Sequence, residues 1–63
     1  MELRKFNNKV VRITDIDNQT FEGLCLYEDK DVYDEELDGL SIKSGPRWTK
    51  LFEDEIKEVE IIA

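Results

Sequence analysis

The stretch that decides the fold is VVRITDIDNQTFEGLCLYE, residues 10–28. Apolar and polar residues alternate over residues 11–14, and this period of two is typical of a strand with one buried face. Residues 17–19, Asp-Asn-Gln, interrupt the alternation with side chains that tolerate turn conformations. The alternation resumes over residues 20–28. The stretch therefore predicts two antiparallel strands joined by a tight turn.

Gly23 lies in the middle of the second predicted strand, where a side chain would normally help packing. A glycine at such a place indicates a sharp bend or a close approach of another backbone. Phe21, Cys25 and Tyr27 share its face of the strand. A strand that bends at a glycine can contribute to two faces of a barrel, so Gly23 favours a curved sheet.

The flanking segments complete an all-β pattern. Residues 2–8 are expected to form one or two helical turns, with Leu3 and Phe6 on the same side. Residues 29–39 are the most acidic part of the chain and predict either an exposed loop or a strand extension, with Val32, Tyr33 and Leu37 as candidate apolar anchors. Further strands are expected at residues 40–43, 47–52 and 58–62, separated by a turn at 44–46 and a turn or single helical turn at 53–55.

These elements predict one domain, residues 1–63, with five strands and a short N-terminal helix. The connections are too short for parallel crossovers, so the strands must pair antiparallel. The expected fold class is all-β, a five-stranded, strongly bent antiparallel small barrel. Its predicted core is Leu3, Phe6, Val11, Ile13, Phe21, Cys25, Tyr27, Leu40, Ile42, Leu51, Ile56, Val59 and Ile61.

The chain is acidic, with nine Lys and Arg residues against sixteen Asp and Glu residues and a net charge of −7. This balance disfavours nucleic acid, whose phosphates attract cationic surfaces, and it disfavours anionic membranes. No apolar run reaches the ~18 residues of a membrane span, and residues 1–6 lack the apolar centre of a signal peptide. With one cysteine and no disulfide, we expect a cytoplasmic location.

No group of residues predicts catalysis, so we expect no enzyme and no cofactor. Histidine is absent, and neither Ser41 nor Ser44 has an evident base partner. Cys25 lies among apolar residues and is expected to be a core residue. Residues 34–39 resemble the start of a calcium loop, but the twelfth place holds Gly45 instead of glutamate. No metal site is therefore predicted, and weak calcium binding and a solvated acidic loop remain the alternatives there.

Residues 11–29 resemble the first signature of Sm-like (LSM) proteins, a family of small barrels related in shape to SH3-like barrels. The matching places are Asp17, Gly23, Cys25, Tyr27 and Asp29. The resemblance implies the five-strand barrel with a leading helix, pairing of the fourth and fifth strands between neighbouring copies, and RNA binding. In the second signature the family has Arg-Gly, where this chain has Glu53-Asp54-Glu55, and an asparagine, where it has Asp38-Gly39. Acidic groups at those places would repel phosphate.

Two functions follow as expectations. The first is a non-catalytic assembly or protein-binding module, which forms homo-oligomers through its edge strands and is complementary to a basic protein partner. The second is an RNA-binding homo-oligomeric ring, which is implied by the resemblance. Trp48 either caps the core or is exposed beside Arg47, where it could stack on a base or dock a protein. The candidate contact residues are Tyr33, Lys43, Arg47, Trp48 and Lys50, and the candidate oligomer edge is Thr49, Leu51, Val59 and Ile61.

Overall fold

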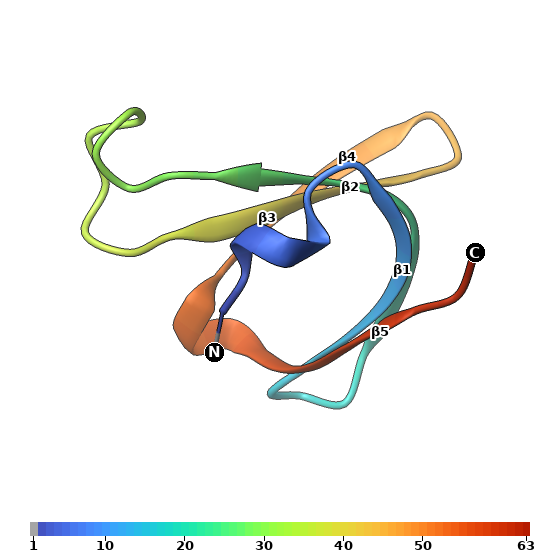
Figure 1. Ribbon diagram of the computed structural model, residues 1–63. Coiled ribbons are helices and arrows are strands. Elements are labelled where there is room, and N and C mark those ends of the chain that lie inside the picture. Colours follow the sequence, from blue (N-terminus) through green and yellow to red (C-terminus); the bar gives the residue numbers. More distant parts are fainter. Residues whose placement is uncertain (1) are drawn as a thin grey trace.

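The two strands predicted from the quoted stretch are the centre of a five-stranded antiparallel sheet (Figure 1). The structure is a computed structural model and describes residues 2–63. The strands lie in the order β4-β3-β2-β1-β5, so each strand pairs with its neighbour in sequence except that β5 returns to β1. Their bounds are β1 Lys9–Asp15, β2 Thr20–Glu28, β3 Gly39–Ser44, β4 Arg47–Phe52 and β5 Ile56–Ile61.

The expected N-terminal helix is shorter than predicted. It is a single 3-10 turn, η1 at Arg4–Phe6, in which the Phe6 N–H donates to the Leu3 carbonyl at 3.0 Å. Asn8 then adopts a left-handed φ of 67° and donates its N–H to the Cys25 carbonyl at 2.7 Å. This backbone bond ties the chain to β2, so the helix cannot continue. Leu3 and Phe6 are nevertheless both buried, as their spacing predicts.

The second helical turn, η2 at Glu53–Glu55, lies where the sequence predicts a turn and connects β4 to β5. β5 begins at Ile56, two residues earlier than expected, and Ile56 is buried as a core residue. Among the described residues, no helix has the length and apolar character needed to cross a membrane.

At Gly23 the backbone of β2 lies unusually close to the backbone of β3. Its φ is +154°, and a Cβ built on it would lie 1.7 Å from the Lys43 carbonyl oxygen. Glycine is therefore required at this point, because any side chain would overlap an atom of β3 that cannot move alone. The close approach expected at Gly23 is confirmed.

The turn between β1 and β2 is organised by Asp15, a residue that the pattern analysis did not single out. Asp15 is buried, and its Oδ1 accepts hydrogen bonds from the Asp17 N–H at 2.9 Å and the Gln19 N–H at 2.8 Å. Asn18 takes a left-handed φ of 64°. A carboxylate that accepts two backbone N–H groups favours the turn over continued strand.

The core lies on one side of the sheet and is covered in part by η1, which packs against β2. Most of the predicted core is confirmed, but Phe21, Tyr27 and Val59 are only partly buried and pack at its margin. Ile61 was predicted to be in the core and is 50% exposed, because β5 has no strand on its outer side. The fully buried or nearly buried members are Leu3, Phe6, Val11, Ile13, Cys25, Leu40, Ile42, Leu51 and Ile56.

The acidic segment 29–38 is an exposed loop, the first of the two alternatives expected for it. It is held by the Asp38 carboxylate, which accepts the Lys30 N–H at 2.9 Å, and by the Asp29 carboxylate, which accepts the Asp31 N–H at 2.8 Å. The prediction that Val32 and Tyr33 anchor the loop is wrong, since the two side chains are 76% and 54% exposed. Polar contacts therefore hold this loop. Val32 faces outward, whereas the half-exposed Tyr33 ring lies against Lys50 and Leu37 is partly buried.

Candidate interaction surfaces

The outermost strands, β4 and β5, are not paired with each other in the part of the chain that the structure describes. Directly after the end of β5, the Ile62 N–H donates to the Val10 carbonyl at 3.0 Å. Hydrogen bonds alternate along an antiparallel pair, so the N–H groups of Val59 and Ile61 point away from β1. The sheet therefore ends in an open backbone edge at β5, where the sequence analysis placed one.

The β4 edge follows the same alternation. A two-residue turn, Gly45-Pro46, joins β3 to β4, and the pair that closes such a turn is hydrogen bonded. Thr49 and Leu51, both expected at the edge, then bond toward β3. The outward N–H groups belong to Trp48, Lys50 and Phe52. That of Phe52 donates to Glu55 Oε1 at 2.9 Å, so Glu55 covers one end of the edge.

Lys50 is enclosed by an acid and two aromatic rings. Its Nζ forms an ion pair with Glu28 at 2.9 Å and lies 5.2 Å from the Tyr33 ring centre and 4.8 Å from that of Phe52. The hydrogen bond that the Lys50 ammonium donates to the Glu28 carboxylate raises the pKa of Lys50 above its ordinary value. Tyr33 and Lys50 are thus brought together, but the lysine charge is already neutralised inside the molecule.

Glu28 is the acid of this cluster, and it also accepts a hydrogen bond from the Ser41 hydroxyl at 2.7 Å. Burial raises the pKa of Glu28, but the hydrogen bonds from Lys50 and Ser41 outweigh it and lower the pKa below its ordinary value of 4.5. Glu28 and Ser41 were not among the predicted site residues. The alternation of β2 and β3 places them on one face, but their pairing depends on the register.

The pH dependence of stability tests this cluster. A carboxylate whose pKa is lower in the folded protein stabilises it above the ordinary pKa, and the stabilisation is lost as pH falls through the folded pKa. Glu28→Gln is therefore expected to be less stable than the parent at neutral pH, with the difference narrowing below pH 4.5. Urea unfolding of both proteins across this range measures it. In a Lys50→Gln background, the difference in stability caused by Glu28→Gln at neutral pH should be smaller. If the stabilities of the parent and Glu28→Gln change with pH in parallel, Glu28 is not the group whose pKa is lowered.

Lys43, Arg47 and Trp48 form a second group at the turn between β3 and β4. Lys43 and Trp48 are partners across the two strands, and Arg47 precedes Trp48. Trp48 is 48% exposed, so it does not cap the core. Neither Lys43 nor Arg47 makes an ion pair within residues 2–63. The five predicted contact residues thus fall into two separate groups, and only this second group carries cations without a partner carboxylate.

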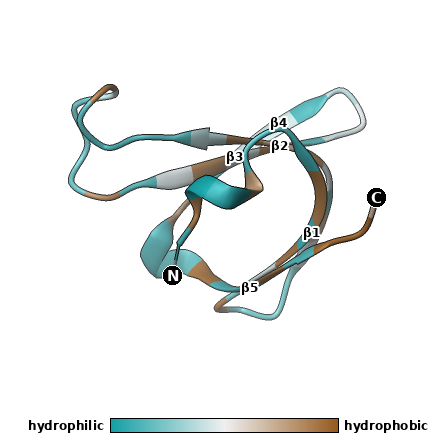
Figure 2. Ribbon diagram, in the orientation of Figure 1, coloured by the Kyte–Doolittle hydropathy of each residue, from teal (hydrophilic) through white to brown (hydrophobic). Residues whose placement is uncertain are grey.

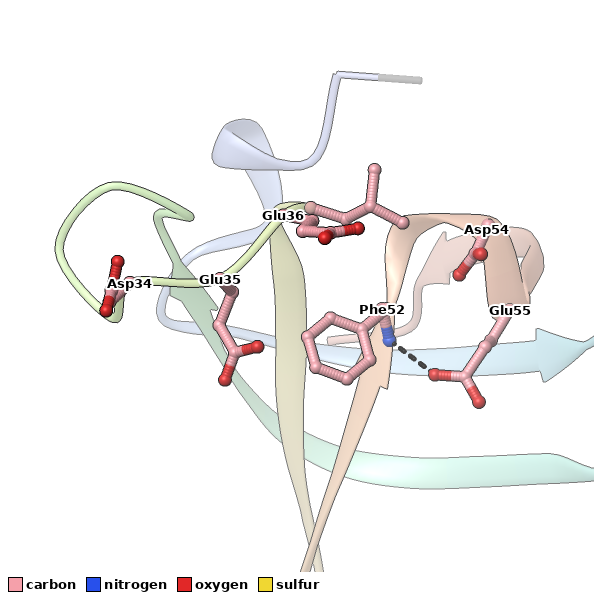
Figure 3. Close-up of a pocket in the computed structure, with 7 residues that line it drawn as sticks. Asp34, Glu35, Glu36, Phe52, Asp54 and Glu55 are labelled. Carbon is pink, nitrogen blue, oxygen red and sulfur yellow. Dashed lines mark hydrogen bonds between the residues drawn. The ribbon is translucent and has the colours of Figure 1, made fainter.

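A pocket of about 690 Å³ lies between loop 29–38 and η2 (Figure 3). Figure 3 shows Glu35 and Glu36 on one side, Asp54 and Glu55 on the other, and the Phe52 ring between them. No Lys or Arg lines it, so its potential is negative. Two of the residues that line the pocket, Asp54 and Glu55, belong to η2. Its lining residues are Asp34, Glu35, Glu36, Leu37, Phe52, Asp54 and Glu55.

Cys25 and the acidic residues offer little redox or metal chemistry in the described structure. Cys25 is buried in the core, and burial raises the pKa of its thiol to about 11, which keeps it protonated at neutral pH. Across residues 2–63, no three acidic or sulfur side chains are grouped closely enough to hold a metal ion.

Comparison of this chain with protein-family models, with curated proteins and with solved structures found no match in any of the three.

Proposed function

We propose that this protein is a non-catalytic assembly module that pairs with copies of itself through β4 and β5. The proposal includes a strongly bent Sm-like small barrel as its fold, and a cytoplasmic setting, which the lone cysteine favours. The observation that carries it is the pair of open edges, because β4 and β5 each have outward N–H groups and, within residues 2–63, no strand beyond them. Unpaired edges of this kind are templates for another chain.

Charge sets the conditions for assembly. Each copy has a net charge of −7, so copies repel one another at low ionic strength. Salt screens this repulsion, with a Debye length of about 10 Å at 0.1 M. Strand pairing relies on backbone hydrogen bonds, which salt affects far less. Edge-to-edge assembly is therefore expected to strengthen as salt is added.

Ile61→Pro tests the β5 edge. Its N–H points outward, so proline removes a donor for a neighbouring chain while leaving the hydrogen bonds between β5 and β1 in place. Ile61→Ala is the matched control, because it loses the same exposed side chain but keeps the N–H. At about 0.5 M salt, sedimentation velocity should find oligomers for the parent and Ile61→Ala and monomers for Ile61→Pro. A parent that stays monomeric at high concentration would refute the proposed assembly.

A basic protein partner is the second element of the proposal. The pocket between loop 29–38 and η2 presents several Asp and Glu carboxylates, which suit a guanidinium or ammonium group. Complementary charge would also speed association with such a partner. The pocket lies beside the end of the β4 edge that Glu55 covers. A basic partner in the pocket and a neighbouring copy on β4 would therefore bind to adjoining surfaces and interfere with each other.

RNA binding in a ring is the second candidate function, and one observation favours it. Lys43 and Arg47 flank the exposed Trp48 without a partner carboxylate, an arrangement suited to a phosphate and a stacked base. Lys50, by contrast, is neutralised by Glu28. Filter binding with U-rich and A-rich oligonucleotides at low salt decides this alternative, because retention of neither excludes it.

A further inference from the structure

An apolar row crosses the outer face of the sheet, on the side away from the core. Val10 is the strand partner of Leu24, Leu24 of Lys43, and Lys43 of Trp48. Ile62 extends the row past β1 through its hydrogen bond to Val10. We call Val10, Leu24, Trp48 and Ile62, with Lys43 among them, the outer row. Strand spacing makes it about 19 Å long.

The apolar members of the outer row are all exposed, from 37% for Val10 and Leu24 to 48% for Trp48. Single exposed apolar residues are ordinary on a protein surface, but here Ile62, Val10 and Leu24 are neighbours across three strands, and Trp48 follows beyond Lys43. The row is also unusual in its charge. Lys43 lies within it and makes no ion pair within the described residues. Arg47, which also makes none there, precedes Trp48 at the start of β4, where alternation places its side chain on the opposite face.

The other cations described on this face, Arg12 and Lys50, form ion pairs with carboxylates of the same chain. Arg12 forms ion pairs with Glu22 at 2.7 Å and with Glu60 at 2.9 Å, and Lys50 forms one with Glu28. The outer row is therefore apolar with unbalanced positive charge at one end, on a chain that is otherwise strongly acidic. The chemistry that complements it is an apolar side chain, or two, between carboxylates.

Loop 29–38 has this chemistry. Val32 and Tyr33 are its exposed apolar side chains, and Asp31 and Asp34 flank them in the sequence. Figure 2 shows the loop as mostly hydrophilic with a hydrophobic part near its tip. The loop is also ordered, because the Asp29 and Asp38 carboxylates accept backbone N–H groups within it. An ordered loop loses little conformational freedom on binding.

Loop 29–38 and the β3–β4 turn lie at opposite ends of the molecule, so they cannot meet within one chain (Figure 1). We infer that loop 29–38 of one copy docks on the outer row of a second copy, with Val32 and Tyr33 against the apolar side chains and the loop carboxylates near Lys43 and Arg47. The contact joins different surfaces on the two copies, so it is head-to-tail and can propagate.

This inference rests on the proposed self-assembly and adds a second contact to it, which depends differently on salt. Docking of the acidic loop on Lys43 and Arg47 is attractive and weakens when salt is added. Pairing of β4 with β5 opposes the net repulsion and strengthens with salt. Self-association at low salt therefore reports the loop contact, whereas self-association at high salt reports the edges.

Charge exchange tests the loop contact. Lys43→Glu with Arg47→Glu makes the row acidic. Asp31→Lys with Asp34→Lys reverses the two charges that flank Val32 and Tyr33, so each pair sets like charges against each other at the contact. All four changes together restore opposite charges and the parent net charge of −7. Lys5→Glu with Lys9→Glu is the matched control, because both residues are exposed, lie outside the outer row and change the net charge as much as the row pair does.

Sedimentation velocity of the full chain at about 0.02 M salt should show self-association of the parent and of the control pair. The row pair and the loop pair should each weaken it about tenfold or more, and the fourfold variant should recover it. A row pair that associates like the parent, or a fourfold variant as weak as either pair, overturns the loop contact. If the row pair loses only binding of a single-stranded oligonucleotide, the outer row serves nucleic acid and the inference also fails. A parent protein that forms no oligomers at high salt would instead contradict the pairing of β4 with β5.

Discussion

Gly23→Ala is expected to prevent folding of this protein. The added Cβ would lie 1.7 Å from the Lys43 carbonyl oxygen and 2.8 Å from the Lys43 carbonyl carbon, both of them backbone atoms of the neighbouring strand. Relieving that overlap requires β2 and β3 to separate where they are hydrogen bonded. The cost should reach ~4 kcal/mol or more, in the range reserved for severe steric or backbone lesions.

That cost is comparable to the whole stability of a chain this size. A domain of 63 residues has a free energy of unfolding of roughly 3–9 kcal/mol. Thermal unfolding followed by circular dichroism measures the effect, with Gly45→Ala as the matched control. Gly45 also has a positive φ, of 61°, but a Cβ there meets no atom within 4 Å. The control should lose only about 1–2 kcal/mol, and equal melting temperatures for the two variants would show that no backbone clash exists at Gly23.

Ile13→Ala is expected to have the next largest effect, a loss of about 2–5 kcal/mol in the free energy of unfolding. Ile13 is fully buried on β1, so truncation leaves a cavity that a small core cannot close easily. Urea unfolding gives the loss directly. Val10→Ala on the same strand is the control, because Val10 lies on the outer face and is 37% exposed. It should change stability by less than ~1 kcal/mol.

For Phe21→Ala, the sequence pattern and the structure predict different losses of stability. The pattern places Phe21 at the centre of the core, which would make Phe21→Ala the most damaging truncation. In the structure Phe21 is the strand partner of Ile13 but is only partly buried. We therefore expect Phe21→Ala to cost less than Ile13→Ala, and the reverse order would restore Phe21 to the centre of the core.

The five strands could be predicted from the sequence because each has its own local signal. The alternation of residues 11–14 and the turn residues 17–19 need only the period of two and the preferences of Asp and Asn. Gly45-Pro46 marks a hairpin in the same local way. Boundaries were less certain, since β5 begins at Ile56 and η1 is one 3-10 turn. Those limits are set by tertiary contacts, such as the bond from the Asn8 N–H to Cys25.

The candidate contact residues could be named from the sequence but not grouped from it. Tyr33 and Lys50 are distant in the chain, and only the path of loop 29–38 over β4 brings the ring within 5.2 Å of the ammonium group. Glu28, which neutralises Lys50, gave no signal, because Asp and Glu residues are abundant in this chain. The separation of Lys50 from Lys43 and Arg47 is likewise a result of register.

The sequence by itself determined that this chain is all-β, that its strands are antiparallel, and where its turns and its required glycine lie. Alternation, turn chemistry and glycine geometry act over a few residues, so they can be read without the fold. Only the tertiary structure decided that Trp48 is exposed, that Ile61 leaves the core, and that the outer row runs across the strands. These properties depend on which residues face each other across hydrogen-bonded strands, and register is set by the packing of the whole sheet.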